Sequence, residues 1–126
     1  MADVIQDIPA NLWVTATAAV NTSVTATLPL VSGQFHYIVG IELVKLYSVV
    51  GVASGSGVIV TTTNLPGNPS FTTEQLALAA GSVSRVISWF TEVPIKSSVA
   101  GTATTFVAPA QLQTIWRWNV IYYTGT

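Results

Sequence analysis

Hydrophobic and polar residues alternate along most of this chain with a period of two, as in β-strands that bury one face. In the first such segment, Leu12, Val14 and Ala16 fall on one side, opposite Trp13 and Thr15. The segments with a β pattern are residues 11–20, 23–30, 35–51, 58–63, 82–93, 104–110 and 113–125. They lack the intervening helices that a parallel sheet requires, so an all-β, antiparallel two-sheet sandwich of seven to nine strands is predicted. Greek-key connections would make it a jelly roll.

One short helix is expected at about residues 73–80. Thr72 and Gln75 have the spacing of a capping box, and Gly81 fits the residue that follows a helix end. Leu76 and Leu78 also alternate, so a further strand is the competing interpretation.

The segment from Phe35 to Val50 is largely apolar on both faces. If the strand is regular, one face carries Phe35, Tyr37, Val39, Ile41, Leu43 and Lys45, and the other carries His36, Ile38, Gly40, Glu42, Val44 and Leu46. The second sheet would cover one face and a neighbouring subunit the other. Gly40 indicates a bulge or a close backbone approach.

Aromatic residues are concentrated in the later strands, at Trp89, Phe90, Trp116, Trp118, Tyr122 and Tyr123. By alternation Trp116, Trp118 and Tyr122 share one face, with Arg117 opposite, which is the pattern of a core stripe. Such residues fill a sandwich core, form a subunit interface or stack on a sugar. Core or interface is the prediction for Trp89, Trp116, Trp118 and Tyr122.

Residues 1–10 form an N-terminal arm, ahead of a single domain at residues 11–126. The arm holds Val4, Ile5 and Ile8, which a purely solvated tail would not need. Pro9 biases Ile8 toward an extended conformation, which suits addition of a strand to a neighbour's sheet edge. A frayed terminus is the alternative.

Composition restricts the function classes. The 126 residues are 50% hydrophobic and only 7% charged, against about 25% charged in an ordinary soluble domain. Four basic residues and a net charge of −1 provide no basic patch for nucleic acid. The sequence contains no run of about 18 apolar residues, the length that a membrane-spanning helix requires. Solubility must come from the 28 Ser and Thr residues, or partners must cover much of the surface.

Little in the chain indicates catalysis. His36 is the single histidine, so a histidine-based metal site has no second ligand, and a hydrogen-bonded strand histidine is the expected role. No Gly-x-Ser-x-Gly motif and no cysteine are present. Glu42, within an apolar strand, is expected to pair with Arg85 or Arg117. No enzyme activity, catalytic residue, metal site or cofactor is predicted.

Residues 34–126 resemble small jelly-roll structural proteins of tailed bacteriophages. The features that carry the resemblance are Trp89 and Phe90, Pro94 to Ser97, Gly101 to Ala103, Ala108 to Ala110, and the closing residues Trp116, Asn119 and Tyr122. The resemblance implies a virion protein, such as a capsid decoration (cement) protein or a module of a head or tail fibre.

The expectation is therefore a capsid decoration protein of the virion, a homo-oligomer with a trimer favoured, that docks on the major capsid protein or another virion protein. Neither nucleic acid nor membrane is an expected partner. The alternative is a carbohydrate- or receptor-binding β-sandwich of a phage fibre, which would need exposed aromatic residues beside Asp, Asn or Glu.

Overall fold

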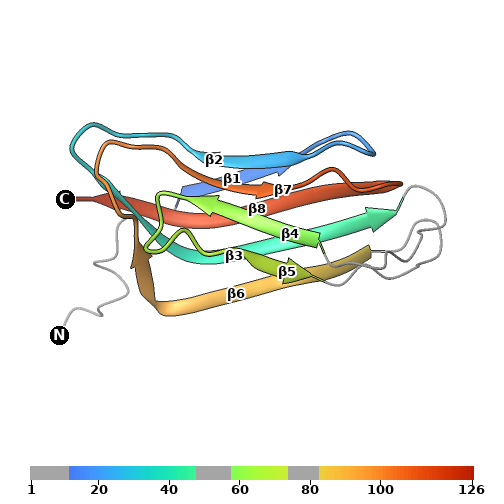
Figure 1. The fold of residues 1–126 in the computed structure, drawn as a ribbon. Helices are drawn as coiled ribbons and strands as arrows, with labels where there is room; N and C mark the ends of the chain where they lie inside the picture. The colour runs from blue at the N-terminus through green and yellow to red at the C-terminus, as the bar shows by residue number, and fades with distance from the viewer. Residues whose placement is uncertain (1–11, 48–57, 74–82) are drawn as a thin grey trace.

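The structure is a computed structural model that describes residues 12–47, 58–73 and 83–126. These residues form two four-stranded sheets packed face to face (Figure 1). The strands are β1 (Leu12–Thr17), β2 (Val24–Leu28), β3 (Phe35–Tyr47), β4 (Val58–Thr63), β5 (Phe71–Thr73), β6 (Val83–Lys96), β7 (Thr104–Ala108) and β8 (Thr114–Gly125).

The strand order is β1-β8-β3-β6 in one sheet, here called sheet A, and β2-β7-β4-β5 in the other, here called sheet B. All neighbouring strands are antiparallel. Apart from β4 and β5, which are neighbours in sheet B, successive strands lie in opposite sheets, and the two strand orders are those of a jelly roll, so the predicted fold class and topology are confirmed. The expected helix at about residues 73–80 is wrong at Thr73, which ends strand β5, and its residues 74–80 lie outside the described residues.

The core lies between the sheets and is built from the inward positions of each strand. Trp116, Trp118 and Phe106 have no exposed surface, and the rings of Phe106 and Trp118 have centroids 5.7 Å apart. Arg117, between the two tryptophans, is exposed. The alternation in the last strand therefore separates core from surface as predicted.

Strand β3 contains a bulge at Val39, which shifts its register against both neighbouring strands. Before the bulge His36 and Ile38 face the core, and after it Ile41 and Leu43 do. The expectation of one regular face from Phe35 to Lys45 is therefore wrong, because the extra residue exchanges the two faces.

Gly40 follows the bulge and supports the ring of Phe90 on the outer side of sheet A. A Cβ atom at position 40 would lie 2.6 Å from Cε1 of Phe90. The interpretation of this glycine as the mark of a bulge is confirmed, and the group that approaches it is the side chain of Phe90 and not a backbone.

His36 ties three parts of the sandwich together at one end. Its Nε2 lies 2.8 Å from the carbonyl oxygen of Pro29, which can only accept, so Nε2 carries the proton. Its Nδ1 lies 2.7 Å from Oγ1 of Thr104. Asn64 donates to the same threonine oxygen and also bonds the backbone of Val99. The predicted structural role of His36 is confirmed.

Candidate functional site

The two sheets differ completely in charge. All six charged residues in the described part of the chain lie on strands of sheet A: Glu42, Lys45, Arg85, Glu92, Lys96 and Arg117. The strands of sheet B carry none. The outer faces of the sandwich therefore present different chemistry.

A polar network crosses the middle of the outer face of sheet A. Oγ1 of Thr15 donates to Oδ1 of Asn119 over 2.9 Å, and Nδ2 of Asn119 donates to Oε1 of Glu42 over 3.0 Å. The other carboxylate oxygen, Oε2, lies 2.9 Å from Nε of Arg85. The expected pairing of Glu42 with Arg85 or Arg117 is confirmed for Arg85. The chain of partners holds the Glu42 carboxylate and the Asn119 amide in fixed orientations.

The next row of paired residues on the same face of sheet A is apolar. Register places Trp13, Ile121, Gly40 and Phe90 side by side on β1, β8, β3 and β6. Trp13 is 65% exposed and Phe90 is 59% exposed, although both are large aromatic residues. They flank a hollow of about 290 Å³ lined by Trp13, Glu42, Phe90, Asn119 and Ile121. This is the aromatic hollow, the feature of this face with the most varied chemistry.

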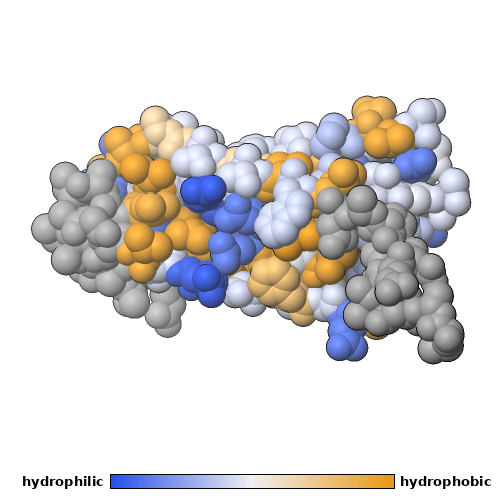
Figure 2. Space-filling model, turned by 180° about the vertical axis from the view of Figure 1, so that it is seen from behind, coloured by the Kyte–Doolittle hydropathy of each residue, from blue (hydrophilic) through white to orange (hydrophobic). Residues whose placement is uncertain are grey.

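Figure 2 shows the same outer face, with a hydrophilic band that crosses it between two hydrophobic areas. On one side of the polar network lie Leu46, Ile115 and Val83, which are paired across the strands. On the other side lie the aromatic hollow and the stacked rings of Tyr37 and Tyr123, whose centroids are 4.9 Å apart.

The described residues on the outer face of sheet B are mostly threonines, and none of them is charged. Six threonines point outward, together with Ile59 and Val107: Thr25, Thr27, Thr61, Thr63, Thr72 and Thr105. Thr63 and Thr105 hydrogen-bond to each other across the strands over 2.6 Å. Each threonine presents one methyl and one hydroxyl group, so this face can be dehydrated without burying a charge.

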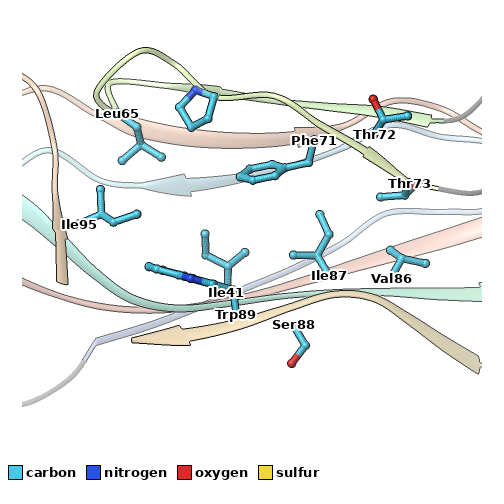
Figure 3. A pocket seen from close by; sticks show the side chains of 11 residues that line it. Ile41, Leu65, Phe71, Thr72, Thr73, Val86, Ile87, Ser88, Trp89 and Ile95 are labelled. Carbon is cyan, nitrogen blue, oxygen red and sulfur yellow. The ribbon is translucent and has the colours of Figure 1, made fainter. Parts of the chain in front are cut away.

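A second cavity, of about 590 Å³, opens between β5 and β6, the outer strands of the two sheets. In Figure 3, Leu65 and Phe71 face Ile41, Ile87 and Trp89 across the gap, while the hydroxyl groups of Thr72 and Ser88 point away. Its lining offers apolar contact and almost no directional polar group. It is the incompletely closed side of the core.

Burial changes the titration of two core residues. It lowers the pKa of Lys45, whose side chain is almost fully buried and whose Nζ lies 5.0 Å from the centroid of the Trp116 ring. It raises the pKa of Tyr122, which packs edge-on against His36. Both side chains belong to the core and not to the outer faces.

The described residues include no group of three or more His, Cys, Asp or Glu side chains arranged to hold a metal ion. Nor does any helix in the described part of the chain have the length and apolar character to cross a membrane. The features described on the outer faces are polar hydrogen-bonding groups, exposed aromatic rings and a face of threonine side chains.

The predicted core or interface aromatics do not gather at one site. Trp116, Trp118 and Tyr122 are buried in the core, and Trp89 is half-buried at the cavity between β5 and β6. The arm residues Val4, Ile5 and Ile8 lie outside the described residues.

Sequence reasoning missed the aromatic hollow. Its signal was present, because Trp13 stands on the polar side of the alternation with Thr15, and Phe90 directly follows the inward Trp89. Joining these residues to Glu42 and Asn119 required the strand order, which alternation does not contain.

No protein-family model and no curated protein matches the chain. Among solved structures, it is similar to one described as "CBM4 structure and function", at 11% sequence identity and a TM-score of 0.26. The match covers 90% of this chain and 93% of the other. At this TM-score the likeness carries no argument about function.

Proposed function

We propose that this chain is a non-enzymatic structural protein of a phage virion, a capsid decoration protein that forms trimers and docks on the particle. The observation that carries the proposal is the charge-free outer face of sheet B, in a sandwich that keeps every described charge on the other sheet. Charged residues are depleted at the centres of protein interfaces, because their burial requires compensation.

The rest of the surface supports a protein that is covered by partners. Twelve large hydrophobic residues of the described part are exposed, including Val93 at 77% and Leu112 at 61%. Extended apolar surface on a protein with so few charges is typical of association surfaces. The outward side chains Val44 and Leu46 of β3 are half-buried within the chain, so they require less cover from a subunit than the sequence suggested.

The experiment places a lysine on each face and measures assembly. Thr25 and Thr61 flank Val107 on the outer face of sheet B. We expect the variant Thr25→Lys/Thr61→Lys to fold, since both side chains are exposed, and to lose binding to phage heads assembled without the chain. Thr17→Lys, on an exposed β1 position of sheet A, is the matched control and should bind like the unaltered chain.

Sedimentation tests the self-association. A trimer at micromolar concentration is the expected result for the unaltered chain. A well-behaved 13.3 kDa monomer, together with full head binding by Thr25→Lys/Thr61→Lys, would overturn both parts of the proposal.

A further inference from the structure

We propose that the aromatic hollow on sheet A is a binding site for a neutral oligosaccharide. Its lining combines exposed aromatic rings, Trp13 and Phe90, with a carboxylate and an amide, Glu42 and Asn119. A pyranose ring presents the complementary surfaces, with apolar C–H faces for stacking and hydroxyl groups for directional hydrogen bonds. This site goes beyond the proposed assembly role and does not depend on it.

The two rings stand apart by a distance suited to sugar. Trp13 and Phe90 lie on the two outermost strands of sheet A, and the Phe90 ring leans inward over Gly40. Strand β1, which carries Trp13, and strand β3, over which the Phe90 ring lies, are two strand spacings apart, roughly 10 Å. This spacing is about the length of a disaccharide.

The polar side of the hollow is prepared for hydroxyl groups. Glu42 and Asn119 are oriented by Thr15 and Arg85, so their planar groups are already fixed before a ligand arrives. Each carboxylate oxygen has a further lone pair with which to accept a hydroxyl proton. A fixed hydrogen-bonding group loses less conformational entropy on binding, which favours affinity.

Charge selects neutral sugars over acidic ones. The carboxylate of Glu42 lines the hollow, whereas its ion-pair partner Arg85 and the other arginine, Arg117, lie outside the lining. An acidic sugar would place its own carboxylate near that of Glu42. A hydroxyl group, in contrast, donates to it.

The hollow and the threonine face can be occupied together. They lie on the outer faces of different sheets, with the core between them. A particle-bound copy that docks through sheet B would therefore present the hollow outward.

The test is a titration of the full chain with cellotetraose, maltotetraose and tetragalacturonate, followed by NMR of the tryptophan indole N–H groups. We expect a neutral tetrasaccharide to shift the Trp13 signal with millimolar affinity, while Trp116 and Trp118 stay unchanged because they are buried. Tetragalacturonate should bind at least tenfold more weakly.

Three variants separate a site from general surface stickiness. Phe90→Ala and Glu42→Gln should each weaken binding about tenfold, the loss of roughly 1.4 kcal/mol. Phe71→Ala removes a partly exposed phenylalanine from the other cavity and should leave binding unchanged. If the chain binds neither neutral tetrasaccharide, or if Phe71→Ala matters as much as Phe90→Ala, the proposal is wrong. Concentration-dependent broadening of the Trp13 signal without any sugar response would assign this face to contact between copies instead.

Discussion

Trp118 is the residue at which the division between core and surface is sharpest. It has no exposed surface, and its neighbour Arg117 points to the opposite side. We expect Trp118→Ala to lower the free energy of unfolding by about 3–5 kcal/mol, the usual loss for a buried aromatic residue. Arg117→Ala should change it by less than about 0.5 kcal/mol. Urea unfolding of both variants checks the register, because an error of one residue would reverse the two results.

Lys45 makes the stability of the fold depend on pH. Burial lowers its pKa below the usual 10.5, so between the two values the unfolded chain holds more protons than the folded chain. The contribution of Lys45 to the free energy of unfolding therefore rises as the pH rises toward 10.5. Tyr122 acts in the opposite sense above pH 10, since its raised pKa keeps a proton on the folded chain after the unfolded chain has lost it.

Lys45→Met isolates the first effect, because it replaces the ammonium group by an apolar end of similar length. We expect the difference in the free energy of unfolding between the Lys45→Met variant and the unaltered chain to shift in favour of the unaltered chain as the pH is raised from 7 to 10, because methionine has no proton to release. Urea titrations at both pH values measure it. An equal difference at both would show that the protonation of Lys45 has no influence on folding.

At the scale of elements, the bulge in β3 determines which residues meet. Val39 adds one residue, so His36 and Lys45 both face the core although an odd number of positions separates them. Gly40 next to it leaves room for the Phe90 ring of the neighbouring strand. The aromatic hollow exists because a bulge, a glycine and a phenylalanine coincide on two paired strands.

Gly40→Ala tests this arrangement. The added Cβ displaces the Phe90 ring, but the ring is mostly exposed and can turn aside, so we expect the free energy of unfolding to change by less than about 1 kcal/mol. In a Phe90→Ala background the space is free, and the same substitution should stabilise by about 0.5–1 kcal/mol because alanine restricts the unfolded chain. A double-mutant cycle from thermal unfolding measures the coupling. Equal effects in both backgrounds would mean that the bulge, and not the ring, requires glycine.

Alternation along a strand predicts well which side chains face the core, as long as the strand is regular. It identified seven of the eight strands, missing the short β5, and it identified the inward side of β8, where Trp116 and Trp118 are regular neighbours of Arg117. It failed in β3, because a single extra residue reverses the faces and leaves no mark on composition beyond Gly40. The second property that alternation does not predict is which strands are neighbours in a sheet. Asn119 meets both Thr15 and Glu42 only because β8 lies between β1 and β3.

At the scale of the whole molecule, the jelly roll separates two chemistries that the sequence interleaves. The charged strands β3, β6 and β8 are separated along the chain by the uncharged strands of sheet B, and every connection between successive strands except that of β4 to β5 leads to the opposite sheet. The result is one face without charge and one with a polar network and exposed aromatic rings. Composition predicted that solubility comes from Ser and Thr or that partners cover much of the surface, and the fold places the threonine-rich strands of sheet B and the described charges on different sheets.

Removal of the N-terminal arm, residues 1–10, tests whether the arm is needed for assembly on the virion. Strand β1 begins at Leu12, so a chain that starts at Ala10 retains every described strand and should unfold at a similar temperature. The arm carries two acids, Asp3 and Asp7, whereas the described residues have an excess of cations, with Arg85 and Lys96 exposed on the outermost strand β6. We therefore expect the arm of one copy to add as an extended strand to this edge of another copy.

We expect the truncated chain to bind phage heads at least tenfold more weakly than the full chain. A full-length variant with Val4, Ile5 and Ile8 changed to serine provides the control for length, and it should lose binding to a similar extent if the apolar side chains anchor the arm. Thermal unfolding separates this loss from misfolding, since both variants should retain the melting temperature of the unaltered chain. Full-strength head binding by the chain that starts at Ala10 would show that the arm is a frayed terminus. Weak binding by the truncated chain but full binding by the serine variant would assign the effect to the backbone and the two acids, because the extended strand and its charges would then suffice.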